Sequence, residues 1–171
     1  ITTIYVTHDQ EEALSISDRI AVMHDGHVEQ LGEPQEIYTS PSNMFVANFI
    51  GTSTFLDGTG QNGVVNLLGK KKLSFAMDPG FRGDVKVSIR PEYVRLGAPK
   101  DGEITGTITL ATFLGDFMNY EIELENHQII EVNEYTDRMD HRYQAGERVS
   151  LHLIEQKISV FDAKTEKTLM L

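Results

Sequence analysis

From residue 54 to residue 162 the chain consists almost entirely of short strand-like segments separated by turn residues. One segment, Tyr120-Glu121-Ile122-Glu123-Leu124, has the period of two that is typical of a strand with one buried face. The predicted strands span residues 54–58, 63–68, 72–76, 84–90, 103–113, 118–124, 128–133, 148–153 and 158–162. Many short strands with turn signals between them favour a small closed β-barrel or a pair of barrels.

Residues 1–51 have a different pattern. Helices are expected at residues 10–16, 34–38 and 44–50. Two strand-like segments, 19–24 and 27–31, flank Asp25-Gly26, a dipeptide typical of a type I′ hairpin turn. The composition then shifts to Gly, Thr, Ser and Asn, and a domain boundary is therefore predicted near Thr52.

The run Ile1-Thr2-Thr3-Ile4-Tyr5-Val6 is almost continuously apolar or β-branched, which is typical of a strand buried on both faces of a parallel sheet. Asp9 is expected to cap the next helix, and Glu12 completes a capping box of the Asp-x-x-Glu type. His8 would then lie where a parallel strand ends and a helix begins, the edge at which α/β sheets place their chemistry.

The stretch from Tyr5 to Leu14, continued by Ser17 to Met23, Asp25-Gly26 and Gly32-Glu33-Pro34, resembles the switch-histidine segment of ABC-transporter ATPases. Ile89-Arg90-Pro91-Glu92 is similar to an element of the oligobinding-type regulatory domain of solute-importing ABC ATPases. The segments 106–115, 146–151 and 160–162 resemble other strands of that domain. The resemblance indicates the maltose, iron and polyamine importer type of ATPase.

The resemblance implies a mainly β fold, an oligobinding-like barrel preceded by a small α/β remnant. Residues 1–51 would be the C-terminal tail of the nucleotide-binding domain, and residues 52–171 a TOBE-type regulatory domain. His8 would hydrogen-bond the γ-phosphate of ATP in the intact ATPase, because phosphoryl transfer needs donors aimed at the transferred oxygens. A histidine that merely caps a helix is the alternative. Thr112 stands where sugar importers usually carry Glu, and the continuation Phe117-Met118-Asn119-Tyr120 resembles the iron and polyamine branch more closely.

Several motifs of such an ATPase are absent from the 171 residues. There is no G-x-x-x-x-G-K-[S/T] phosphate loop, no Leu-Ser-Gly-Gly-Gln signature, and no apolar strand that ends in Asp-Glu. The chain is therefore expected to be the C-terminal part of a longer ATPase and to be inactive alone. ATP and Mg²⁺ would bind the intact parent protein, and no cofactor is expected for this chain by itself.

The formal net charge is −11, and residues 1–51 contain eight acidic residues against one arginine. This acidity argues against binding of nucleic acid. The resemblance implies two partners, a second copy of the chain bound through the β-domain and the transmembrane permease subunits. It also implies a cytoplasmic position on the inner face of the membrane. The alternative function is a β-barrel that senses an oxyanion or another small effector, which a basic pocket lined by Ser and Thr would favour.

Four other groups of residues have structural interpretations. His24 and His27 should face each other across the hairpin, although two imidazoles without a third ligand are a weak metal site. The run Lys70-Lys71-Lys72 is interpreted as a solvated turn. Arg90 and Glu92 are expected to form an ion pair that fixes the turn at Pro91, with an interface or effector site as the alternative. The aromatic residues between 113 and 120 are expected in the core or in a dimer contact.

Overall fold

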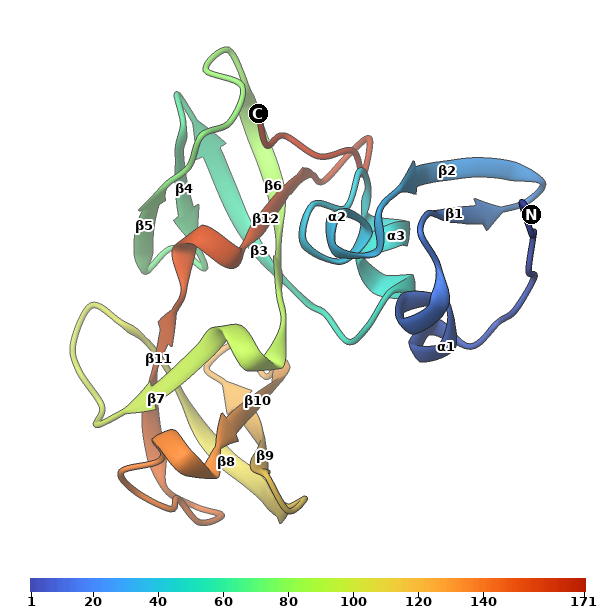
Figure 1. Cartoon of the computed structure of the whole chain (residues 1–171). Helices are drawn as coiled ribbons and strands as arrows, with labels where there is room; N and C mark the ends of the chain where they lie inside the picture. The colour runs from blue at the N-terminus through green and yellow to red at the C-terminus, as the bar shows by residue number, and fades with distance from the viewer.

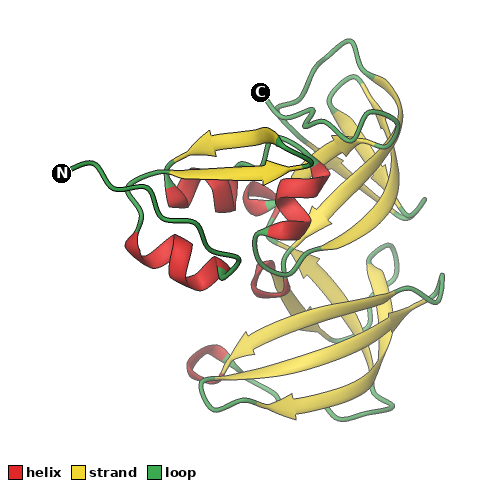
Figure 2. Cartoon of the chain, turned by 90° about the vertical axis from the view of Figure 1, so that its right-hand side faces the viewer, coloured by secondary structure: helices red, strands yellow, loops and turns green.

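The structure is a computed structural model that describes residues 1–171. Its helices and strands are, in chain order, α1 (Gln10–Ile16), β1 (Ile20–His24), β2 (His27–Gly32), α2 (Pro34–Thr39), α3 (Met44–Phe49), β3 (Thr54–Gln61), β4 (Val64–Leu67), β5 (Lys71–Ser74), β6 (Arg82–Ile89), β7 (Val94–Gly97), β8 (Ile104–Phe113), β9 (Phe117–Leu124), β10 (Ile129–Tyr135), β11 (Arg148–Leu153) and β12 (Ser159–Asp162). Three 3₁₀ turns complete the order: η1 (Pro91–Tyr93), η2 (Thr136–Arg138) and η3 (Glu155–Lys157). The predicted mainly β class is confirmed (Figures 1 and 2).

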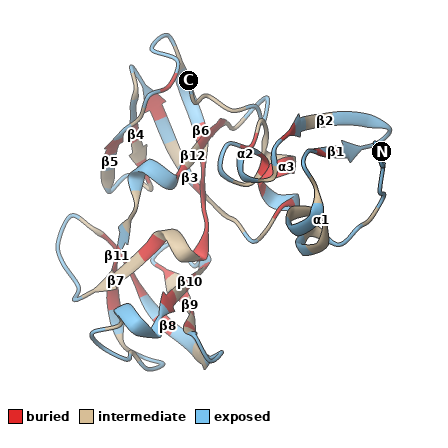
Figure 3. Ribbon diagram, in the orientation of Figure 1, coloured by how far each residue is buried: buried red, intermediate tan, exposed pale blue.

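Ten strands form two five-stranded antiparallel sheets, ordered β12-β6-β3-β4-β5 and β10-β9-β8-β11-β7. The second sheet curls into a nearly closed barrel, in which the Oε1 of Glu134 on β10 accepts the backbone N–H of Leu96 on β7 at 3.0 Å. Both sheets contribute to a single cluster of 21 buried apolar residues (Figure 3). Burial of this shared cluster stabilises the two sheets as one body.

The period of two predicted for β9 is confirmed. Met118, Tyr120, Ile122 and Leu124 are all buried, and the residues between them are partly exposed. The neighbouring strand β8 has a register irregularity between Ile108 and Leu110, which leaves the side chain of Leu110 exposed. Bulges of this kind bend a strand, as closure of a small barrel requires.

The first fifty residues form a smaller unit against the sheet that contains β3 and β6. The β1–β2 hairpin turns at Asp25 and Gly26, with φ of +46° and +78°, so the predicted turn is confirmed. Helices α2 and α3 lie between this hairpin and the sheet (Figure 1). A separate cluster of five buried residues holds the unit together: Ile20, Val22, Ile37, Val46 and Ile50.

One expected strand is absent, and one observed strand was not expected. Residues 1–7 form no strand, and Ile1, Ile4 and Val6 are largely exposed. The segment pairs with no strand of the three sheets, so its backbone groups have no ladder partner. Conversely, the short strand β7 was not predicted, although it pairs with β11 in the barrel.

None of the helices is long and apolar enough to cross a lipid bilayer.

Candidate functional site

His8 lies in the turn that leads into α1, and the hydrogen bonds of its neighbours define this turn. The carboxylate of Asp9 accepts the backbone N–H of Glu12 at 2.9 Å, so the predicted cap is confirmed. The predicted capping box is only half formed, because the backbone N–H of Asp9 donates to the hydroxyl of Thr7 at 3.0 Å. The carboxylate of Glu12 instead accepts the hydroxyls of Thr7 at 2.9 Å and Tyr5 at 3.1 Å.

The imidazole of His8 is exposed and forms no hydrogen bond or ion pair within the chain. Both ring nitrogens are therefore free to interact with another group. The neighbouring turn is acidic, and the hydrogen bond to Glu12 raises the pKa of Tyr5. Chemically, this arrangement can offer one hydrogen-bond donor to an incoming oxygen. Arg19 is the single basic residue among residues 1–51.

The first residue of α1 is tied to the segment that enters β3. The side-chain Oε1 of Gln10 accepts the backbone N–H of Gly51 at 2.7 Å. Gly51 has a φ of +77°, and a Cβ added to it would lie 2.7 Å from Nη1 of Arg90 and 3.0 Å from Cε2 of Tyr38. The helix that follows His8 is thus joined to a crowded junction between α2 and the β-sheet.

Arg90 is the central residue of this junction, and only 5% of it is exposed. Its guanidinium lies over the ring of Tyr38, 3.8 Å from the ring centroid. It donates to the carbonyl oxygens of Tyr38 at 2.9 Å and of Thr52 at 3.4 Å. The hydroxyl of Tyr38 in turn donates to Glu92 at 2.5 Å. Burial, together with this hydrogen bond, raises the pKa of Tyr38 well above its ordinary value.

The predicted ion pair between Arg90 and Glu92 is therefore wrong. Both side chains contact Tyr38, the arginine at the ring and carbonyl and the carboxylate at the hydroxyl. The backbone is extended at Arg90 and turns into a 3₁₀ helix at Pro91. Because of this change, side chains two residues apart no longer share one face as they would in a strand.

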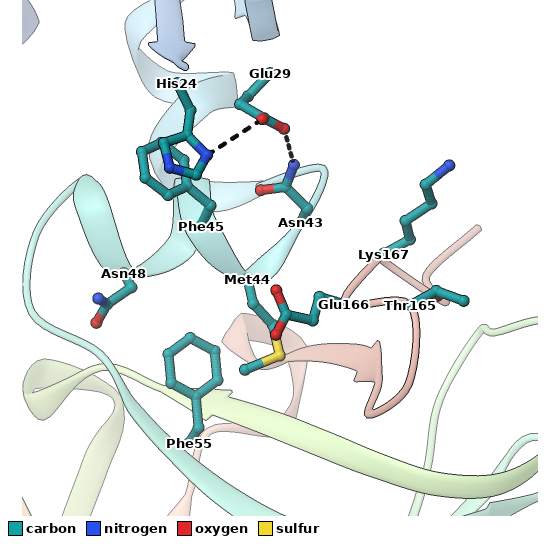
Figure 4. A pocket seen from close by; sticks show the side chains of 10 residues that line it. All are labelled: His24, Glu29, Asn43, Met44, Phe45, Asn48, Phe55, Thr165, Glu166 and Lys167. Carbon is teal, nitrogen blue, oxygen red and sulfur yellow. Dashed lines mark hydrogen bonds and ion pairs between the residues drawn. The ribbon is translucent and has the colours of Figure 1, made fainter. Parts of the chain in front are cut away.

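An open groove of about 530 Å³ lies beside α3, between the β1–β2 hairpin and the turn after β12, which contributes residues 165–167 (Figure 4). The ring of His24 stacks on Phe45 with 3.9 Å between centroids. Glu29 accepts the side-chain amide of Asn43 at 2.6 Å and lies 3.6 Å from Nδ1 of His24. The backbone N–H of Met44 donates to the carbonyl of residue 166 at 2.9 Å. Of the two carboxylates that line the groove, Glu29 has partners within the chain and Glu166 has none. Because the backbone bond of Met44 holds residue 166 against α3, we describe the groove as the packing site of the turn after β12.

The other residues singled out from the sequence have structural contacts. His24 and His27 are register partners across the hairpin, as predicted, and His27 places Nδ1 3.0 Å from the carbonyl oxygen of Asp25. The structure contains no group of three or more His, Cys, Asp or Glu residues arranged to hold a metal ion. Phe113 is exposed, whereas Tyr120 is completely buried in the core.

The lysine run is only partly the solvated turn that was expected. Lys71 and Lys72 belong to β5, which begins one residue earlier and ends two residues earlier than the strand predicted at 72–76. Lys70 forms an ion pair with Glu125, and Lys71 forms one with Glu103. Because each carboxylate gains a cationic partner, the pKa values of both Glu125 and Glu103 are lowered. The two pairs link the first β-sheet to the second.

Sequence reasoning missed three residues of the junction: Gln10, Tyr38 and Gly51. Their contacts span 41 to 54 positions of the chain, so no local spacing could reveal them. One available signal was Gly51 directly after a predicted helix, where a positive φ is common.

Comparison with known proteins gives matches along most of the chain. Residues 87–161 match the TOBE domain family. An Fe(3+) ions import ATP-binding protein, FbpC of Fusobacterium nucleatum, is 41% identical over 165 residues, which is 94% of this chain and 44% of FbpC. A spermidine/putrescine import ATP-binding protein, PotA of Borreliella afzelii, is 43% identical over 163 residues, which is 94% of this chain and 45% of PotA. The chain thus spans about half the length of these relatives.

One solved structure has a similar fold. The cytoplasmic molybdate-binding protein ModG, with molybdate bound, superposes with a TM-score of 0.50 over 63% of this chain and 94% of ModG. The sequence identity is 14%, so the likeness concerns the fold alone. It supports the description of the β-sheets as a barrel-type domain.

Proposed function

This chain contains a TOBE domain and matches ATP-binding subunits of ABC importers over most of its length, and from that premise we propose a place for it in such a subunit. It is the C-terminal part of the ATP-hydrolysing, energy-coupling subunit of an importer for a small solute of the ferric-ion or polyamine class. ATP and Mg²⁺ bind the intact subunit, which works with transmembrane permease subunits at the cytoplasmic face of the membrane.

The extent of the sequence matches is the observation that carries this proposal. The TOBE domain accounts for residues 87–161, whereas the matches to the iron and polyamine proteins cover 94% of the chain. Most of residues 1–51, outside the β-domain, must therefore lie within the matched region. A free-standing TOBE module would not require similarity in this part.

Within this function, His8 donates a hydrogen bond to the γ-phosphate of ATP. Phosphoryl transfer depends mainly on positioning and on donors aimed at the transferred oxygens. The geometry supports this role, because the turn is fixed by Thr7, Asp9 and Glu12 while the imidazole itself remains free. The phosphate loop, the signature motif and the catalytic carboxylate would come from a part of the subunit outside these 171 residues.

The test is the ATPase activity of the full-length subunit that contains this chain. His8→Ala should reduce kcat by roughly 10²- to 10³-fold, the usual effect of removing one donor to a charged transition state, with ATP binding largely retained. His27→Ala removes another exposed histidine and is the matched control, expected to leave kcat unchanged. Activity of His8→Ala within a factor of two of wild type would exclude the proposed role.

The β-domain also serves regulation and self-association in this proposal. Three large apolar side chains are exposed near the β8–β9 turn: Leu110 at 48%, Phe113 at 57% and Leu114 at 54%. Neighbouring exposed apolar side chains are typical of a surface that contacts a partner. A second copy of the chain is the partner that the family resemblance implies.

A further inference from the structure

A second cavity, of about 230 Å³, lies where α2, the end of β6, η3 and β12 meet. Its lining is polar and contains two cationic residues, Arg90 and Lys157, but no aspartate or glutamate. This is unusual in a chain whose formal net charge is −11. The cavity is distinct from the groove beside α3, and the proposed ATPase function makes no use of it.

The strand register explains why these side chains meet. Ser88 and Arg90 are two positions apart at the end of β6, so both lie on the side opposite to the core residues Val87 and Ile89. Ser159 on β12 is the register partner of Ser88, which places the two serines side by side. Lys157 is two residues before Ser159, in η3. Helix α2 covers this face and contacts Arg90 through Tyr38.

The charge of Arg90 has no anionic partner in the chain. The residue is 5% exposed, and its guanidinium donates to two carbonyl oxygens, yet none of the ion pairs includes it. A guanidinium has five N–H donors, so three remain for another acceptor. Buried charges in proteins are normally paired, because an isolated buried charge is costly. Glu92 does not line the cavity, and it accepts the hydroxyl of Tyr38 instead.

Ser88 gives a second, independent observation. It is 6% exposed and lines the cavity, and its hydroxyl takes part in none of the side-chain hydrogen bonds of the chain. No fully buried side-chain polar atom lacks a partner, so this hydroxyl must reach the cavity space. A buried hydroxyl that opens only to a cavity is satisfied by water or by a ligand.

We propose that this cavity binds a small tetrahedral oxyanion of the inorganic phosphate class, held by Arg90, Lys157, Ser88 and Ser159. Two cations and two hydroxyls supply the charge-assisted hydrogen bonds that such an anion accepts. The volume is below the roughly 300 Å³ at which pockets for larger ligands begin, so a nucleotide does not fit. The anion joins α2 to β6 and β12, and its binding does not depend on the proposed ATPase function.

Titration of the purified chain with inorganic phosphate at constant ionic strength, followed by calorimetry and by amide NMR shifts, tests the proposal. Wild type should bind saturably at millimolar phosphate or below, with the largest shifts at the amides of residues 88, 157 and 159. Lys157→Ala, at an exposed position, and Ser88→Ala should each weaken binding by about tenfold, the value of one hydrogen bond to a charged group. Lys164→Ala is the matched control, since Lys164 is also exposed and unpaired, and should leave binding within twofold.

A nucleotide distinguishes the free anion from a large phosphate ester. ATP should show no saturable binding at this cavity, because it is larger than the volume of about 230 Å³. The proposal is overturned if wild type does not bind phosphate saturably, if Lys157→Ala binds as tightly as Lys164→Ala, or if ATP binds and the free ion does not. Sulfate should bind with the same dependence on Lys157 and Ser88.

Discussion

The hydroxyl of Tyr38 on α2 donates a hydrogen bond of 2.5 Å to Glu92 in η1, although the two residues are 54 positions apart. This contact fixes the helical unit of the first fifty residues against the β-domain. Arg90 completes the junction by lying over the face of the same ring. The junction is therefore a specific tertiary contact that can be tested by pairwise substitution.

Tyr38→Phe and Glu92→Gln should each lower the free energy of unfolding by about 1–3 kcal/mol, since either change weakens a partly buried hydrogen bond to a charged group. The double variant should lose less than the sum, because both substitutions remove the same bond. Urea denaturation of the four proteins measures this coupling. Tyr5→Phe, which removes a similar but exposed bond to Glu12, is the control and should have little effect. Strict additivity of the two losses would show that the contact contributes nothing.

Gly51→Ala should be more destabilising than Gly69→Ala. Both glycines have a positive φ, +77° and +68°, so both substitutions incur about 1 kcal/mol of backbone strain. Only at Gly51 would the new Cβ meet Arg90 and Tyr38, at 2.7 and 3.0 Å, whereas nothing lies within 4 Å at Gly69. The difference in unfolding free energy between Gly51→Ala and Gly69→Ala therefore measures the cost of this steric clash, which should be about 1–3 kcal/mol. Equal losses for the two variants would contradict the close packing of the junction.

Glu134 makes a pH-dependent contribution to stability. Burial raises its pKa above the ordinary 4.5, and the N–H of Leu96 and the charge of Arg95 offset part of the rise. Between pH 4.5 and the raised pKa, the folded state binds more protons than the unfolded state. The contribution of Glu134 to the free energy of unfolding is therefore full below pH 4.5 and is lost as the pH rises through the raised pKa. The stability of wild type relative to Glu134→Gln should therefore decline with rising pH in that window. Thermal denaturation at several pH values measures this difference, and a rise in it would refute the assignment.

The ion pair between Lys71 and Glu103 should stabilise the contact between the two sheets. The side chains of Lys71 and Glu103 are 21% and 19% exposed. Lys71→Met should lower the free energy of unfolding by about 1 kcal/mol. The loss should shrink in 1 M salt, where the screening length falls to about 3 Å. Lys72→Met alters the adjacent lysine, which is exposed and has no ion pair, and serves as the control. Denaturant titrations at low and high salt give the loss of unfolding free energy in each condition. Equal losses for Lys71→Met and Lys72→Met would show that the ion pair is not stabilising.

Self-association through the exposed β8–β9 region can be tested by sedimentation equilibrium. Replacing both Phe113 and Leu114 by serine should weaken association by about tenfold or more, because exposed aromatic and aliphatic anchors dominate such contacts. Val64→Ser, at a 37% exposed position on the other sheet, is the control. A wild-type chain that remains monomeric at high concentration would remove this proposal.

The parts of the fold that local patterns determine were predicted from the sequence. The Asp25-Gly26 turn, the Asp9 cap and the alternation along β9 each depend on residues a few positions apart. The strand β7 escaped prediction because it is four residues long and is stabilised by β11, more than fifty positions away. Residues 1–6 have a strand-like composition, but a strand also needs a neighbour, and composition cannot supply one.

The candidate sites also depend on contacts that local sequence patterns do not determine. His8 was identified by resemblance, because its own surroundings in the chain show only an exposed imidazole on a capped turn. For Arg90, local spacing suggested Glu92 as the partner, whereas the actual partner, Tyr38, lies 52 positions away. The cavity lined by Ser88 and Ser159 depends on strand register, which becomes known only once the sheet is formed.

The hydrogen bonds of Arg90 have a consequence for protein engineering. They reach the carbonyls of Tyr38 and Thr52, which lie on the helical unit and at the proposed boundary, while Arg90 itself belongs to the β-domain. A chimera that joins the β-domain to a foreign helical unit at residue 52 would leave this guanidinium buried without its stacking ring. Grafts that carry residues 34–52 together with the β-domain should therefore express and fold better than grafts cut at the boundary.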